Sequence, residues 1–479
     1  MHKVILFISF LTQSMLTFSS DTLLVSNELI ASYTKPQLEE IYAQNNIPTF
    51  FVPVNFEIDI YKLTYKTVDI DGQETIASGA LVVPDVDTCF SQLQYHHGTT
   101  TLTDNVPSRE SDELVIGIVF GSSSGFVTSL PDYLGLGDEP GLHPYVHAES
   151  EASCSIDMLK ATRQFCKENN IALNEQLFLT GYSQGGHAAL AVHRELQNDP
   201  SHNFEVTASA PMSGPFDLSG IMFDIMVQNE NYPQPSFVPY VILSYEEVYG
   251  DIYDDLSEVF VSPFDTLIPV WFDGSKSTSF ISSQLPDVPK EAMQPAFFQA
   301  LTTNDSHPLR IALQKNDLYN WKPESPVNFF YCGGDETVPP ENSTMAANNF
   351  QSLGATSIFT TEVSSTLDHS GCVSQAIIFA KFWFDDMKEG CVATEINDPL
   401  SQNELEIYPN PVTDDLIIKS IRRNVKSTDQ VVEIYNQLGA MITSFNLKDN
   451  HRISFSSFNE GLYYLKIQGT SHVYSVLKK

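Results

Sequence analysis

The spacing of apolar and polar residues predicts strands and helices that succeed one another regularly over most of the chain. Residues 56–69 and 75–85 alternate with the period of a strand, and Asp71-Gly72 between them is a hairpin turn signal. Further predicted strands are residues 92–95, 125–133, 177–179, 204–218, 327–332 and 355–364, and predicted helices are residues 26–44, 111–120, 155–169, 188–196 and 372–388. Strands that alternate with helices in this way indicate a mostly parallel sheet with right-handed crossovers and helices on both faces.

Two segments depart from this alternation. Residues 216–326 are rich in Tyr, Phe, Met and Pro and show no regular strand pattern, which predicts an insertion that caps the sheet. Residues 393–404 are polar and aperiodic, as expected of a linker. Residues 405–479 then consist of short alternating stretches separated by turns, which predicts an all-β sandwich. The expected division is therefore one α/β domain at 21–392, a linker and a small β domain.

The segment Gly181-Tyr182-Ser183-Gln184-Gly185 follows the short apolar run 177–179 and precedes a helix-forming stretch. A strand, a turn with a glycine two residues on either side of a serine, and a helix make a nucleophile elbow. A side chain at Gly181 or Gly185 is expected to clash with its neighbours in so tight a turn. We therefore expect Ser183 to be a nucleophile at the top of the sheet.

An acid and a base follow the serine in the order that such sites require. Asp335 comes directly after the predicted strand 327–332, and His369 precedes the last predicted helix. Ser183 would attack a carbonyl carbon, His369 would accept its proton, and Asp335 would orient the imidazole. Asp368 is a rival acid, but it is adjacent to His369 in the chain and could reach the ring nitrogen only with strain.

An oxyanion hole needs the backbone N–H of the residue after the nucleophile, here Gln184, and a second N–H from an early loop. Gly98 and Thr99 occupy that loop position. His96 and His97 could suggest a metal, but no third ligand or H-E-x-x-H motif accompanies them, so no metal and no cofactor are expected.

A second G-x-S-x-G sequence occurs at 121–125. Here a helix-like segment precedes the motif and a strand follows it, which is the reverse of an elbow. We interpret it as a flexible turn and Ser123 as inert.

Charge and the N-terminal residues narrow the class of function. The net charge of −35 argues against nucleic-acid binding and against docking onto anionic lipid by charge alone. Residues 1–20 combine a short basic start, an apolar stretch and small residues, which predicts a signal peptide. No other stretch is long and apolar enough to span a membrane, so the mature chain is expected to be soluble and without a transmembrane segment.

The six cysteines of an exported chain permit disulfides, and the sequence leaves their pairing open. If residues 372–389 form one helix, Cys372 and Cys391 lie about 27 Å apart, too far for a direct bond.

The first domain resembles the α/β-hydrolase superfamily over roughly residues 50–392. Within it, the chain is similar to the secretory lipase family in D-Y-x-G-x-G at 132–137, H-P-Y at 143–145, H-G-T at 97–99 and G-Y-S-Q-G-G at 181–186. Residues 334–339, G-D-E-T-V-P, are a looser, shortened form of the family's G-x-x-D-x-x-V-P. This resemblance implies an α/β-hydrolase core with a helical cap and hydrolysis of acylglycerols or other carboxylic esters.

The tail resembles the sorting domain (type A) of the Bacteroidetes type nine secretion system. The matching stretches are Ile407–Val412, Val432–Asn436 with Gly439, Gly461–Tyr464 and the terminal Lys478-Lys479. This resemblance implies that the secretion machinery recognises the tail and that the protein is released or attached to the cell surface. A carbohydrate-binding sandwich is the alternative that short strands alone would also fit.

The sequence therefore predicts a secreted serine hydrolase that cleaves carboxylic esters, with a small-molecule or lipid ester as substrate. Two alternatives remain open at this point: a serine peptidase or amidase on the same fold, and a catalytically inactive cell-surface binding protein. The sequence leaves the acyl chain length and the alcohol moiety open.

Overall fold

The computed structural model describes residues 22–139 and 141–390 of the first domain. In the C-terminal segment it describes residues 405–410, 412–420, 431–436, 441–447, 451–459, 461–468 and 473–478. The predicted signal peptide and the predicted linker lie outside the described residues.

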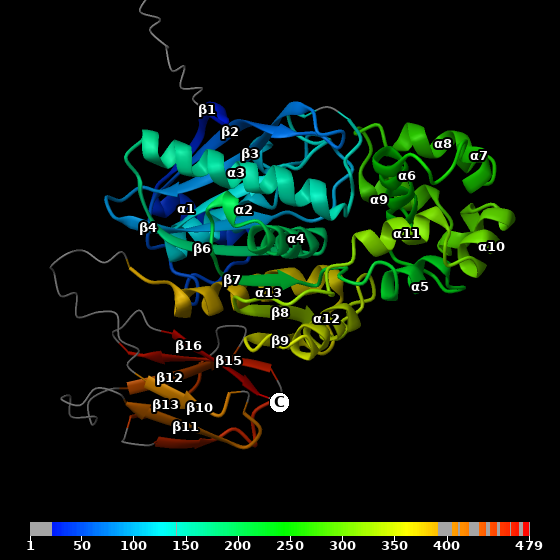
Figure 1. Cartoon of the computed structure of the whole chain (residues 1–479). Helices are drawn as coiled ribbons and strands as arrows, with labels where there is room; N and C mark the ends of the chain where they lie inside the picture. The colour runs from blue at the N-terminus through cyan, green and yellow to red at the C-terminus, as the bar shows by residue number, and fades with distance from the viewer. Residues whose placement is uncertain are drawn as a thin grey trace, which may run out of the picture.

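A nine-stranded sheet forms the centre of the first domain, in the order β1-β2-β3-β5-β4-β6-β7-β8-β9 (Figure 1). The strands are β1 Leu24–Tyr33, β2 Ile58–Val68, β3 Glu74–Pro84, β4 Cys89–His96, β5 Phe126–Pro131, β6 Ala172–Tyr182, β7 Val206–Met212, β8 Val327–Cys332 and β9 Ile358–Ser364. The pairs β1–β2, β2–β3 and β3–β5 are antiparallel, and every pair from β5 to β9 is parallel. The mostly parallel sheet is confirmed, and the carboxyl ends of its parallel strands meet at one edge, where ligands bind in such folds.

Helices cover both faces of this sheet because its strands are apolar on both sides. In β6, Phe178 packs into the core on the face covered by α1 Lys35–Gln44, α2 Leu114–Val119 and α13 His369–Met387. Leu177 and Leu179 point to the opposite face, which α3 Ala148–Glu168, α4 Gln184–Asn198 and α12 Glu341–Ser352 cover. The alternation of successive side chains along a strand thus supplies both cores.

Helices fill the interval between β7 and β8 and group on one side of the sheet (Figure 1). They are α5 Ile221–Val227, α6 Phe237–Tyr249, α7 Leu256–Val259, α8 Phe264–Trp271, α9 Thr278–Gln284, α10 Pro295–Thr303 and α11 Pro308–Lys315. These helices have a hydrophobic core of their own, with Ile242, Ile268 and Leu301 fully buried. Tyr145 and Val146, which lie just before α3, pack into the same core and so join the cap to the rest of the first domain.

The tail forms a separate β domain of two antiparallel sheets, with strand orders β10-β11-β14 and β13-β12-β15-β16. Its strands are β10 Leu405–Tyr408, β11 Asp415–Ser420, β12 Val431–Asn436, β13 Met441–Asn446, β14 His451–Ser454, β15 Gly461–Ile467 and β16 Val473–Lys478. The tail contacts the first domain through aromatic rings: Tyr464 stacks on Phe51 at 3.8 Å between ring centroids. Among the residues described, no helix combines the length and apolar character needed to cross a membrane.

Two predictions of local structure were wrong. Residues 26–33 belong to strand β1, because they pair with β2 as the edge of the sheet, and the helix begins only at Lys35, after Thr34 and with Pro36 in its first turn. Residues 120–124 form a π-helical turn that continues α2, so the second G-x-S-x-G sequence is a buried helical segment and no flexible turn.

Candidate active site

Ser183 lies in a sharp turn between β6 and α4, with φ 59° and ψ −122°. A non-glycine residue in this region of backbone space is strained, typically by about 1–3 kcal/mol, and such strain concentrates at functional sites. The two flanking glycines are needed sterically: a Cβ at Gly181 would lie 2.2 Å from the carbonyl oxygen of Gly185, and a Cβ at Gly185 1.9 Å from that of His96. A side chain at either position would therefore clash with the backbone, as predicted.

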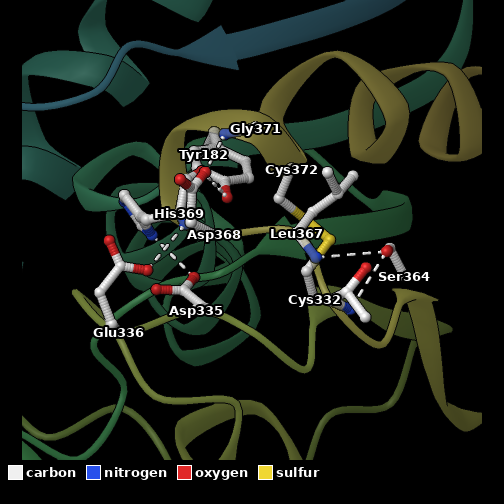
Figure 2. The surroundings of a disulfide bond; sticks show 11 residues. Tyr182, Cys332, Asp335, Glu336, Ser364, Leu367, Asp368, His369, Gly371 and Cys372 are labelled. Carbon is white, nitrogen blue, oxygen red and sulfur yellow. Dashed lines mark hydrogen bonds and ion pairs between the residues drawn. A yellow bond between two sulfur atoms is a disulfide. The ribbon is translucent and has the colours of Figure 1, made fainter.

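Asp335 and His369 are brought together from two separate parts of the chain (Figure 2). Asp335 lies in the loop after β8, and His369 is the first residue of α13. Asp335 Oδ2 lies 2.7 Å from His369 Nδ1. The other carboxylate oxygen accepts hydrogen bonds from the backbone N–H groups of Thr337 and Val338, at 3.1 and 2.8 Å. These two donors fix the carboxylate so that its free oxygen faces the imidazole.

Asp368, the rival acid, has a different role. Its Oδ1 accepts a hydrogen bond from Gly371 N–H at 2.7 Å, so it is the N-cap of α13 (Figure 2). Glu336 is exposed and contacts the backbone N–H of His369, at 3.3 Å, rather than the ring. Among the three neighbouring carboxylates, Asp335 is the one that bonds to the imidazole.

The residue before the serine holds the histidine close to the elbow. Tyr182 donates its hydroxyl to the carbonyl oxygen of His369 at 2.6 Å, and the two rings lie 5.1 Å apart. Ser183 Oγ itself makes no hydrogen bond to His369 in this structure. Hydrogen bonds of this kind are often long without substrate and tighten when it binds. Tyr182 was not singled out from the sequence, since a tyrosine inside an elbow motif gives no signal of such a contact.

A disulfide joins the end of β8 to the first turn of α13, close in the chain to this acid and base. Cys332 ends β8, three residues before Asp335, and Cys372 lies three residues after His369. Both cysteines are fully buried, and their Cα atoms are 6.0 Å apart (Figure 2). Cys154 and Cys166 are buried free thiols.

The three predicted oxyanion donors differ in whether their backbone N–H group already has a hydrogen-bond partner. The N–H of Gly98 donates to both carboxylate oxygens of Glu113, at 3.0 and 3.1 Å, so the prediction that Gly98 donates to an oxyanion is corrected. The N–H groups of Thr99 and Gln184 have no partner among the described residues, and Gln184 is the first residue of α4. Glu113 lies fifteen residues from Gly98 in the chain, and no sequence motif pointed to it.

A pocket of about 530 Å³, a volume that includes open solvent at its mouth, extends from Ser183 into the cap. Its lining is almost entirely apolar. It consists of Tyr145, Val146, Ser183, Pro215, Leu218, Met222, Ile225, Met226, Tyr232, Phe237, Val238, Val241, Leu313 and Val338. A pocket with one nucleophile at an otherwise apolar wall suits a substrate with an apolar group next to its reacting carbon.

The remaining histidines near the site bond to the chain itself. His96 Nδ1 lies 3.0 Å from Thr180 O, and burial lowers the pKa of its ring to about 3. The ring of His97 lies between the carbonyl oxygens of Gly98 and Asp132. Over the described ranges, the one cluster with metal-ligating atoms close together is Glu195, Asp199 and His202, all partly exposed, at the C-terminal end of α4 and just after it.

Comparison with known proteins adds two independent findings. Residues 406–479 match the family model of the secretion system C-terminal sorting domain, and no curated protein sequence matches the chain. Among solved structures, a candidate hydrolase from Legionella pneumophila has a TM-score of 0.72 and 29% identity, over 78% of this chain and 100% of its own. The rice cell wall degrading esterase LipA from Xanthomonas oryzae has a TM-score of 0.67 and 29% identity, over 76% of this chain and 96% of its own. Candida antarctica lipase A shares the fold at 12% identity, with a TM-score of 0.55 over 75% of this chain and 83% of its own.

The first domain has the α/β-hydrolase fold. The tail of the chain is a type IX secretion sorting domain, so the protein is handled by the secretion machinery and is secreted or attached to the cell surface. The structural relatives support, at a general level, an esterase-like hydrolase.

Proposed function

We propose that this α/β-hydrolase cleaves carboxylic esters through an acyl-enzyme on Ser183, with His369 as base and Asp335 as orienting acid. The observation that carries the proposal is the coincidence of three features. A strained serine opens onto an apolar pocket, an Asp–His pair 2.7 Å apart lies beside it, and two backbone N–H groups nearby have no partner.

The proposed reaction has two halves. Ser183 Oγ attacks the ester carbonyl carbon and its proton passes to His369 Nε2, since Nδ1 is held by Asp335. The oxyanion accepts hydrogen bonds from the N–H groups of Thr99 and Gln184. The intermediate expels the alcohol, which takes the proton from His369, and water then cleaves the acyl-enzyme by the same route.

A fluorophosphonate probe tests this proposal against a catalytically inactive binding protein. We expect the probe to form one adduct, located on Ser183 by peptide mass spectrometry, and p-nitrophenyl esters to be hydrolysed much faster than matched p-nitroanilides. An unlabelled Ser183 would contradict a serine hydrolase, whereas faster anilide cleavage would favour an amidase on the same site.

The apolar pocket predicts a dependence on acyl chain length. Each methylene that the pocket buries contributes about 0.8 kcal/mol, so kcat/KM is expected to rise by up to roughly fourfold per methylene until the pocket is full. Val241→Trp, which fills the pocket, should shift the optimum to shorter p-nitrophenyl esters. Ile311→Trp places the same ring on the exposed surface of α11 and should leave the profile unchanged. An identical shift in both variants would contradict the assignment of this pocket to the acyl chain.

Removing the disulfide that joins β8 to α13 is expected to lower both stability and activity. The double variant Cys332→Ala, Cys372→Ala opens a link across 40 residues. It should lose about 4 kcal/mol of unfolding free energy by chain entropy alone, and roughly tenfold in kcat because Asp335 and His369 are held less well. Urea unfolding and steady-state kinetics measure the two effects. Cys89, which also belongs to a disulfide, lies at the opposite end of the sheet at the start of β4, so Cys89→Ala is the control: stability should fall but kcat should not.

A further inference from the structure

The segment between β5 and α3 is well marked in the sequence, as D-Y-L-G-L-G and H-P-Y, yet Asp132, Tyr133 and His143 do not line the pocket. All three are buried. Their polar atoms are directed at the two stretches of chain that carry Thr99 and Gln184. Resting on the proposed function, we infer that this segment positions both halves of the oxyanion hole, through Asp132, Tyr133 and Tyr145 on one side and His143 on the other.

The first half is the loop at residues 97–99. Tyr133 donates its hydroxyl to the carbonyl oxygen of His97 at 3.1 Å, and its ring lies 4.3 Å from the imidazole. His97 Nε2 in turn lies 3.2 Å from the carbonyl oxygen of Asp132. The Asp132 carboxylate is held by Ser78 Oγ at 2.6 Å and by Ser108 N–H at 3.0 Å. The backbone that leads into Thr99 is thereby tied to a fixed and fully buried support.

Tyr145 holds the same loop from the pocket side. Its hydroxyl accepts a hydrogen bond from Thr99 Oγ1 at 3.1 Å. The Tyr145 ring stacks on Tyr240 of α6 at 4.5 Å with 7° between the planes, so its own orientation is set by the cap. Thr99 is thus held through its side chain, while its backbone N–H stays available.

The second half is the first residue of α4. Gln184 Nε2 lies 2.6 Å from His143 Nε2 and 3.0 Å from Glu151 Oε1. Burial lowers the pKa of His143 to about 3, so the ring is neutral, and its Nδ1 donates to Leu134 O at 2.7 Å. Its Nε2 is therefore an acceptor, and the two hydrogens of the Gln184 amide serve two acceptors.

The orientation of the Gln184 side chain is forced by these partners. Its Oε1 is buried without a hydrogen-bond partner, which is unfavourable. Turning the amide round would place that oxygen against two acceptors and leave both of them unpaired. Glu151 is itself fixed by His187, whose Nδ1 lies 2.6 Å from Glu151 Oε2. The side chain of Gln184 is thus anchored on both sides, and its backbone N–H is held with it.

A donor that is already oriented stabilises a developing oxyanion without reorganising during the reaction. The contacts above restrain Thr99 and Gln184 in this way from a single segment. Buried polar networks also stabilise folds in general, so the test must separate kcat from stability.

The test uses changes that remove as little as possible. Tyr133→Phe and Tyr145→Phe each delete one oxygen from the first half, and Gln184→Met removes the amide of the second half but keeps its backbone N–H. Tyr42→Phe is the matched control, because Tyr42 is fully buried and its hydroxyl bonds to Ser122 Oγ at 2.8 Å, with no contact to the site. We expect each of the first three variants to lose roughly tenfold in kcat on p-nitrophenyl esters, with KM within about twofold, and the control to keep its kcat.

Thermal unfolding of all four variants separates positioning from destabilisation. If the Tyr133, Tyr145 and Gln184 variants fold and keep the wild-type kcat, the inference is wrong. If kcat falls only in the Tyr133 and Tyr145 variants, the role assigned to the Gln184 side chain is wrong. If kcat falls only in the Gln184 variant, the role assigned to Tyr133 and Tyr145 is wrong. An equal loss of kcat in Tyr42→Phe would also overturn it, since the effect would then follow from lost stability. Failure of the proposed function can be distinguished from failure of this inference, because Ser183→Ala would then keep its activity.

Discussion

Replacing Ser183 by alanine is expected to lower kcat on p-nitrophenyl esters by roughly 10⁵- to 10⁶-fold, with KM little changed. The substitution removes the atom that we propose forms the acyl-enzyme and leaves the pocket and the proposed oxyanion donors in place. The residual rate would come from those donors acting on a water molecule. Kinetics under substrate saturation, with active-site titration to exclude contaminating esterases, measure the effect.

The chain supplies its own control for this experiment. Ser123 lies in the other G-x-S-x-G sequence, is buried, and has no hydrogen-bond partner for its Oγ. Ser123→Ala is therefore the same chemical change in the same motif, and it should leave both kcat and stability close to the wild type. A wild-type kcat in the Ser183 variant would contradict the proposed mechanism. An equal loss of kcat in Ser123→Ala would also contradict it.

Asp335→Asn is expected to lower kcat by roughly 10⁴-fold. In the wild type the carboxylate accepts from His369 Nδ1, which leaves Nε2 free to take the serine proton. An asparagine whose amide faces the ring donates to Nδ1 instead, so Nε2 carries the proton and the base is blocked. The loss should appear in kcat far more than in KM, because Asp335 does not line the pocket.

Asp368→Asn is the matched control for the acid. It makes the same change one residue before His369, and asparagine caps a helix about as well as aspartate does. We expect its kcat to remain within about threefold of the wild type, because Asp368 bonds to Gly371 N–H and not to the imidazole. If the Asp368 variant loses activity and the Asp335 variant does not, the roles of the two acids must be exchanged.

The sequence was informative where function depends on local chain geometry. The elbow at Gly181–Gly185 could be recognised because its glycines are required by contacts within the turn and with the adjacent strand β4. The order of Ser183, Asp335 and His369 could be read because each follows a strand, and parallel strands bring their carboxyl ends to one edge. The same local patterns distinguished the true elbow from the sequence at 121–125.

The sequence was less informative where a segment's structure depends on a distant partner. Residues 26–33 have helical spacing, but pairing with β2 at the edge of the sheet makes them a strand. All of their side chains are exposed or partly exposed in that strand, so the sequence shows no apolar alternation there. Propensity is a weak guide there because the hydrogen bonds come from another part of the chain.

The site shows the same division. The sequence by itself determined which residues could react, because a nucleophile, a base and an acid have characteristic residue types and local settings. Only the tertiary structure decided which backbone N–H groups remain without a hydrogen-bond partner. The N–H of Gly98 donates to Glu113, whereas the N–H groups of Thr99 and Gln184 have no partner among the described residues. Tertiary contacts also decided how Gln184 is held, between His143 and Glu151. The physical reason is that a buried donor is paired with whichever acceptor the folded chain brings within about 3 Å, and sequence spacing does not encode that distance.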